Sequence, residues 1–305
     1  MAIPSTNNNP PATLASRFKI LEETLPPDIL ESLLTKAVGE YLHNLRVHKL
    51  SKDKLKELIE AFPAALSHTN HQGRLPIHSA VRGEHSMPFV PLLVEEGVKL
   101  NVGGEGNRGG LLVEEPRSNM HPKQNVLQLL ANLKSDNDPA TCDLARLQVL
   151  KELRESNLLR KEDIKEYSML YSSCFSGAKE RFKYLVDCDP QALKESVYNG
   201  KPLIHAVIDS IFRGIDEFAM MVKAGHEHFP EDTDLGFLFK KDENGKTACE
   251  SAFANYGKEE TTKIILECIP EESNPHPIFR HIVKAFVVGE LGANTGGTKR
   301  TRNST

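Results

Sequence analysis

Histidine is the residue type in this chain whose crowding most directly invites a chemical role. Six of the twelve histidines fall between positions 43 and 85, and a neutral imidazole is the commonest metal ligand in proteins. A zinc-binding helix carries two histidines four residues apart beside a glutamate, whereas His43 and His48 are five apart. The remaining four are His68, His71, His78 and His85. Their spacing favours solvated or structural histidines over a metal centre.

A second group of potential metal ligands lies further along the chain. His226 and His228 flank an acid, and more acids follow within a few residues: Glu227, Glu231, Asp232 and Asp234. Imidazole and carboxylate together suit several divalent metals. A polar loop between helices also produces such groups, so a metal-dependent enzyme using this region stays an alternative rather than the expectation.

The stretch 101–110 is rich in glycine, and its continuation to position 124 makes it the longest candidate loop. A glycine-rich loop could cradle phosphate, but this one does not end in the Gly-Lys-Ser/Thr of a P-loop and follows no apolar strand. Its glycines are Gly103, Gly104, Gly106, Gly109 and Gly110. We expect a surface loop of the kind that often carries binding function.

Nucleophilic and acid–base catalysis find no support in the residue pattern. The five cysteines are scattered and never form a Cys-x-x-Cys motif, and no Gly-x-Ser-x-Gly motif is present. Two adjacent acid pairs occur, Glu95 with Glu96 and Glu114 with Glu115, but neighbours in sequence point in different directions. We therefore expect a protein that is not an enzyme, with no catalytic residues, no metal and no cofactor.

Composition narrows the kind of partner. The formal net charge is −4, there is no tryptophan, and aromatic residues make up 6% of the chain. Such a chain does not attract phosphate backbones or anionic lipid as a whole, so we expect neither nucleic acid nor membrane as its partner. No apolar run approaches the roughly 20 residues that cross a bilayer. The cysteines are scattered and suggest no disulfide framework, and we find no secretory pattern in the sequence. We therefore expect the protein to be located in the cytoplasm, with the nucleus as the other candidate.

The apolar residues recur with a helical period through most of the chain. Over 28–46 they follow steps of three and four, as do Leu55, Leu58, Ile59 and Phe62, for which Ser51 is the expected N-cap. Further helices are predicted over 75–81, around 89–93 with Gly97 as a left-handed C-terminal residue, and over 125–133, 144–159, 180–188, 215–225, 260–269 and 277–291. Strand-like alternation is scarce, so the sequence predicts an all-α fold.

One segment of the sequence occurs twice. Shifting the chain by 127 positions places ELIEAFPAALSHTNHQGRLPIHSAV on YLVDCDPQALKESVYNGKPLIHAVI almost without gaps. The motif residues that correspond are Gly73 with Gly200 and His78 with His205, and a third copy begins at Asp242 with Gly245 in its turn. Repetition on this scale is typical of a solenoid of stacked units.

These residues resemble the ankyrin repeat, whose unit has a turn ending in Gly, then Thr-Pro-Leu-His, and a second helix closing near a Gly. Gly73, Pro76 and His78 match that opening; in the second copy the proline stands one place early, at Pro202, and in the third Glu250 replaces the histidine. The resemblance implies that each histidine hydrogen-bonds backbone in the adjoining turn. The interval from His205 to Glu250 exceeds the usual period of about 33 residues, so we infer insertions.

The resemblance implies an all-α helical-repeat solenoid of ankyrin-like pairs over 25–291, between disordered tails at 1–24 and 292–305, that acts as a non-catalytic scaffold or adaptor for proteins of unknown identity. The first and last helices, 28–46 and 277–291, are the candidate caps. The residues expected to contact a partner lie at turn tips and in the long loop: Asn70, His71, Gln72, Arg74, Arg108, Tyr198, Asn199, Lys201, Glu243 and Asn244. A HEAT-like helical scaffold and an enzyme that uses the 101–124 loop stay open as alternatives.

Overall fold

The fold is described by a computed structural model that covers residues 14–45, 50–116, 123–133, 139–198, 200–210, 214–229 and 238–268. These residues are mostly helical, with one two-residue pair of strands, which confirms the all-α prediction. The chain divides into two compact units, residues 1–126 and 127–305. No helix in the described ranges is long and apolar enough to cross a membrane.

Unit 1 consists of short helices that pack on their near neighbours in sequence. α2 (Pro27–Leu42) contacts α4 (Pro76–Arg82), while α3 (Lys52–Ala61) contacts α5 (Val90–Lys99). The shorter elements are α1 (Leu14–Thr24), η2 (Pro63–Ser67), η3 (Met87–Phe89) and η4 (Arg108–Gly110). α4 packs on α5, so the first and second helix of the pair cover each other's apolar faces.

The sequence explains how α3 begins. Ser51 has an extended backbone and its side chain accepts a hydrogen bond from the Lys54 N–H at 3.3 Å, as an N-cap should. Leu55 and Ile59, one turn apart, are 0% and 1% exposed and form the buried face. Both the cap and the period were predicted, and both are confirmed.

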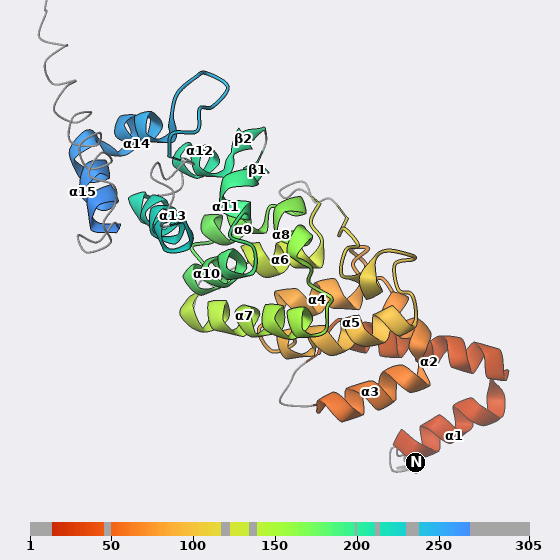
Figure 1. Cartoon of the computed structure of the whole chain (residues 1–305). Helices are drawn as coiled ribbons and strands as arrows, with labels where there is room; N and C mark the ends of the chain where they lie inside the picture. Colours follow the sequence, from red (N-terminus) through yellow and green to blue (C-terminus); the bar gives the residue numbers. More distant parts are fainter. Residues whose placement is uncertain are drawn as a thin grey trace, which may run out of the picture. The chain divides into compact units, whose positions relative to one another are not determined.

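Unit 2 is built from two rows of helices (Figure 1). The second helices form one row, in which α7 (Pro139–Glu155), α10 (Lys179–Cys188), α13 (Ile215–His228) and α15 (Lys258–Cys268) contact one another in order. In the other row α9 (Met169–Phe175), α12 (Leu203–Ile208) and α14 (Ala248–Tyr256) contact one another in order. The remaining elements are α6 (Val126–Asn132), α8 (Lys161–Glu166), α11 (Ala192–Glu195), β1 (Val197–Tyr198) and β2 (Lys201–Pro202).

A buried arginine joins three helices of unit 2. Arg181 of α10 is 1% exposed; it donates to Asp143 of α7 at 2.6 Å and to carbonyl oxygens at the end of α6, those of Leu130, Ala131 and Leu133. Carbonyls at a helix C-terminus lack partners within the helix, so the guanidinium satisfies groups that burial would otherwise leave unpaired. Removing it would leave Asp143 as a buried charge, which typically costs about 3–5 kcal/mol.

Most helices lie where the apolar period predicts them, but short ones were missed. α8 and α9 have six and seven residues, too few for a period to stand out. α1 lies inside 1–24, where the sequence predicts a disordered tail, so helical structure begins earlier than expected. The predicted helix 277–291 and tail 292–305 lie outside the described residues.

The prediction for Gly97 is wrong. α5 continues to Lys99 with Gly97 buried inside it, and the left-handed residue is Asn101, with φ of 53°. Gly97 is needed for a different reason: a Cβ there would lie 2.4 Å from the carbonyl oxygen of Gly109 in η4. The glycine therefore permits close packing of the loop on the helix, a tertiary constraint that a local pattern does not reveal.

We expect Gly97→Ala to destabilise unit 1 by about 1–3 kcal/mol, because the added methyl group forces backbone apart in a packed region. Urea unfolding followed by circular dichroism measures the loss. Val98→Ala in the same helix is the control, since Val98 is 46% exposed and should change the stability by less than about 0.5 kcal/mol. Equal stability of the two variants would show that η4 does not depend on this contact.

Candidate functional site

The turn at Asn70–Arg74, which we call tip 1, is fixed by its own backbone. The Asn70 N–H donates to the Arg74 carbonyl at 3.1 Å, and the Gly73 N–H donates to the Asn70 carbonyl at 2.8 Å. The Asn70 Oδ1 accepts from the N–H groups of Gln72 and Arg74, at 2.9 and 3.1 Å. Gly73 has φ of 71°, which glycine adopts at little cost. Asn70 is thus a structural residue of the turn.

The turn at Asp242–Lys246, tip 2, has the same four hydrogen bonds at equivalent positions. Asp242 replaces Asn70: its N–H donates to the Lys246 carbonyl, and its Oδ1 accepts from the N–H groups of Asn244 and Lys246, both at 2.9 Å. Gly245 has φ of 76°. Desolvation opposes ionisation of Asp242, but hydrogen bonds from Lys246 and Asn244 outweigh it and lower its pKa.

A tetrapeptide leads into each short first helix, for example Leu75–His78 after tip 1 and Thr247–Glu250 after tip 2. We call the fourth residue of such a tetrapeptide position four, and it is buried where it is histidine. His78 is 1% exposed and uses both ring nitrogens. Its Nδ1 accepts from the Leu75 N–H at 3.1 Å, so its Nε2 carries the proton and donates to the Val113 carbonyl at 2.8 Å. The histidine therefore fastens the start of α4 to backbone 35 residues further along.

The segment that His78 contacts is also held by two arginines. Glu115 is 2% exposed; the Arg74 Nε donates to it at 2.9 Å, and Arg82 at the end of α4 forms a second ion pair with it. Burying a carboxylate is tolerated only with such partners. Arg74, which the sequence analysis assigns to a partner surface, is therefore already engaged within the fold. Glu115 and Arg82 were not predicted.

His205 repeats this arrangement in unit 2 with one bond missing. It is 0% exposed and its Nε2 donates to the Lys240 carbonyl at 2.7 Å, again 35 residues downstream. Among the described residues, its Nδ1 has no hydrogen-bond partner. The residue equivalent to Leu75 is Pro202, which has no N–H to donate. The early proline noted in the sequence thus explains the unpaired nitrogen.

Other residues take position four elsewhere. Gln128 at the start of α6 donates from Nε2 to the Tyr167 carbonyl at 3.5 Å, 39 residues downstream. Tyr171 of α9 stacks on Tyr198 of β1, with ring centroids 3.6 Å apart. Glu250 instead accepts from the N–H of Thr247 and caps its own helix. Gln128 and Tyr171 were missed in the sequence because neither lies in a recognisable copy of the motif.

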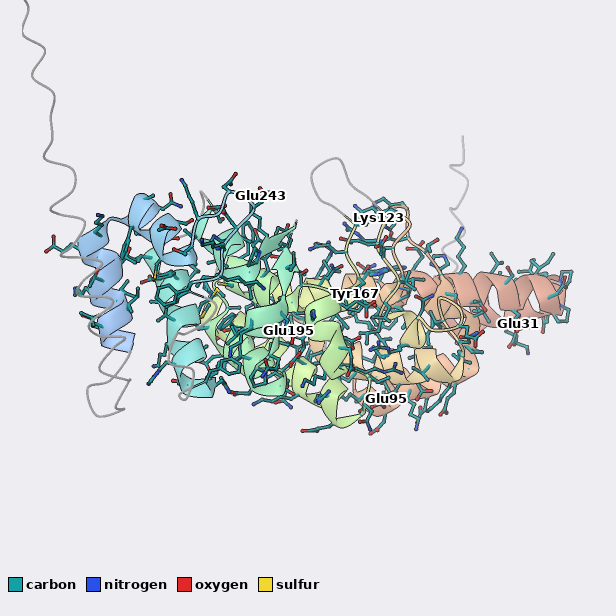
Figure 2. The ribbon with its side chains drawn as sticks, turned by 45° about the horizontal axis from the view of Figure 1, so that its top comes forward. Glu31, Glu95, Lys123, Tyr167, Glu195 and Glu243 are labelled. Atoms are coloured by element: carbon teal, nitrogen blue, oxygen red, sulfur yellow. The ribbon has the colours of Figure 1, made fainter. Side chains whose placement is uncertain are left out.

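The structure describes all but one of the ten predicted contact residues. His71 and Gln72 are exposed at tip 1, and Glu243 and Asn244 at tip 2; Figure 2 shows Glu243 projecting from the ribbon. Tyr198 is half-buried in its stack, Arg108 is half-buried in η4, and Asn199 lies outside the described residues.

The structure brings Lys201 close to tip 2. A hydrogen bond to Asp209 at 2.7 Å raises the pKa of Lys201, with further contributions from Glu243 and Asp242. The half-buried Lys201 of β2 therefore lies near the acids of tip 2 in unit 2.

Histidine, acidic and cysteine side chains are the groups that could bind a metal or act as a nucleophile. No group of three His, Cys, Asp or Glu side chains among the described residues could hold a metal ion. His228 pairs with Asp187 at 3.0 Å, and Glu231, Asp232 and Asp234 lie outside the described ranges. Burial raises the pKa of Cys249 to about 12 and also raises that of Cys188, so both thiols are protonated near neutral pH.

No known protein family, curated protein or solved structure matches the chain.

Restoring a backbone N–H at position 202 should increase the contribution of His205 to the stability of unit 2. Pro202 has φ of −53°, close to the −71° of Leu75, so Pro202→Ala fits the backbone and offers its N–H to the His205 Nδ1. Urea unfolding of wild type, P202A, H205A and P202A/H205A isolates the coupling, since the loss of proline rigidity cancels in the cycle. We expect about 1 kcal/mol of favourable coupling. A coupling near zero would mean that this nitrogen has a partner of another kind.

Unit 1 should lose stability as the pH falls below about 6.5. Burial, as the main cause, lowers the pKa values of His43 and His78 in the folded chain. The unfolded chain binds protons at a higher pH than the folded chain does, so acid favours unfolding. We expect urea unfolding at pH 7.5, 6.5 and 5.5 to reveal the loss.

The variant H43Q/H78Q should lose less unfolding free energy over the same pH range. Glutamine is a suitable replacement because the chain itself uses Gln128 at position four. An unchanged pH dependence in the variant would assign the effect to other groups.

Proposed function

We propose that the chain is a non-catalytic protein-binding scaffold, each unit of which is a stack of degenerate ankyrin-like helix pairs. The observation that carries the proposal is the hydrogen bond from position four to a downstream carbonyl, made by His78 in unit 1 and His205 in unit 2 over the same separation of 35 residues. A single motif match arises easily by chance. Agreement of motif, of a glycine with positive φ and of the separation to the downstream partner, at two places 127 residues apart, does not.

The helix order supports the same reading. A short first helix and a following second helix recur as α4 with α5, α9 with α10, α12 with α13, and α14 with α15, and the members of each pair contact each other. First helices of six to nine residues are too short to be stable alone in water. They depend on neighbours, which is the physical logic of a repeat array.

The tips supply the surface for recognition. Their backbone is held by internal hydrogen bonds, so the exposed side chains of His71 and Glu243 can vary without disturbing the turns. Gln72 and Asn244 are also exposed, and each makes one side-chain hydrogen bond within its turn, to Arg74 and Asp242. A rigid turn also loses little entropy when a partner binds. A rigid backbone that presents exposed polar side chains suits the binding of a partner.

Exchanging two charges at tip 2 tests the proposal. Glu243 and Lys246 are both exposed, so E243K/K246E keeps composition and net charge and leaves the backbone bonds of the turn intact. The purified full chain, immobilised, is incubated with lysate of its source cells, and retained proteins are quantified by mass spectrometry. We expect at least one protein held by wild type to fall by about tenfold with the variant, a change of about 1.4 kcal/mol in binding.

The matched control is K263E/E267K on α15, which exchanges an exposed i,i+4 ion pair in the same way. It should retain the same proteins as wild type. If both exchanges retain the same set as wild type, tip 2 is not the binding surface; if wild type retains nothing above background, the scaffold proposal fails.

A further inference from the structure

The groove between α10 and α13 in unit 2 is distinct from the tips. It is a cavity of about 440 Å³ with apolar side chains at its base, among them Phe182, Val186, Ala219 and Met220. Phe182 and Val186 are 1% and 0% exposed, whereas Ala219 and Met220 are half-buried and accessible from the groove. Both helices belong to the row of second helices, while the tips lead into the first helices.

The two helices run side by side in the same direction. At their C-terminal ends His228 of α13 pairs with Asp187 of α10 at 3.0 Å. Near their N-terminal ends a Cβ on Gly177 would lie 4.0 Å from the Glu217 Oε1. The groove therefore follows the length of α10, which is about 15 Å for ten residues at 1.5 Å each.

Two lysines face each other across the middle of this groove. Lys183 stands four residues before Asp187 and Lys223 five residues before His228, about 6 and 7.5 Å along their helices, so both lie at the same level. Both line the cavity and are exposed, and neither has an ion pair among the described residues. The acids of the rim lie toward its ends: Glu180 and Asp216, with Lys179, at one, and Glu227 at the other.

We propose that this groove binds an amphipathic helix of a partner protein, with its apolar stripe on the base and an acidic side chain near its middle between Lys183 and Lys223. An anion placed between the two lysines reduces the repulsion between their charges. The acids at the two ends of the groove favour basic residues toward both ends of the bound helix. Apolar anchors at helical spacing in a groove of this kind are a common mode of recognition. The proposal rests on the proposed binding function but concerns a second surface.

The test uses two helical peptides of about 14 residues with identical composition and the same leucine stripe. One has glutamates beside the middle of the stripe and lysines toward its ends; the other has these charges exchanged. Fluorescence anisotropy of the labelled peptides with the full-length chain measures both affinities at low and high salt. We expect the peptide with central glutamates to bind at least tenfold more tightly, with a difference that shrinks as salt rises.

Variants of the chain locate the site. K183E/K223E should reverse the preference between the two peptides, while K241E/K246E, which reverses two exposed lysines around tip 2, should leave it unchanged. Equal affinities of the two peptides for wild type, or a preference that K183E/K223E leaves unchanged, would overturn the proposal. Binding of dodecanoate to wild type with no binding of either peptide would also overturn it, in favour of a small amphiphile.

The two proposals fail separately. If K241E/K246E loses lysate proteins but keeps the peptide preference, both surfaces bind. If the peptides do not discriminate while the exchange at tip 2 still releases partners, the scaffold stands and the groove does not bind a helix.

Discussion

The hydrogen bond from position four to a backbone carbonyl 35 residues downstream is the constraint that holds α4 and α12, and through them the segments that they contact. A helix of six or seven residues cannot persist alone, because the entropy of its first turn is not recovered over so short a length. His78 and His205 make that helix part of a larger unit by fixing its start against the segment that leads into the next turn. Tip 2 is therefore positioned from two sides, by its own backbone bonds and by His205 of the preceding helix.

The same constraint explains which substitutions the chain tolerates. Glutamine can donate as histidine does, and Gln128 reaches the equivalent carbonyl at 3.5 Å. Glutamate is an acceptor when ionised and cannot donate to a carbonyl, so Glu250 turns to the N–H of Thr247. Pro202 removes a donor and leaves the Nδ1 of His205 unpaired, which typically costs about 1–3 kcal/mol for a buried group. The downstream bond is thus kept by His78, Gln128 and His205, whereas Glu250 keeps only a local bond.

Sequence reasoning succeeded where the determining interactions are local. The period of apolar residues gave α2 and α3, and Ser51 gave the start of α3, because caps and amphipathic faces depend on residues within one or two turns. The motif also gave both histidines and the glycines of all three turns, whose positive φ is a local requirement.

It failed where the partner is distant in sequence. Gly97 looked like a helix end because its contact with Gly109 cannot be read from neighbouring residues. Arg181 is buried although arginine is usually exposed. Its partners come from α6 and α7, which pack on α10 only in the folded chain. Arg74 looked free because Glu115 lies 41 residues away. Of the predicted contact residues, those that stay exposed lie at the two tips and make no contact with a distant segment that buries them, namely His71, Gln72, Glu243 and Asn244.

Within each helix pair of unit 2, the first helix follows a turn and the second helix lines the groove side, and this division bears on the two proposed binding surfaces. In unit 2 the tips lead into first helices, whereas the groove with Lys183 and Lys223 lies between second helices. The residues that position tip 2, His205 and Asp242, contribute nothing to the base of the groove, and Phe182 and Met220 contribute nothing to the tip. A partner at one surface therefore displaces no side chain that the other requires. A stack of short helix pairs can thus present two independent surfaces from one core, with the two rows of helices as the physical division between them.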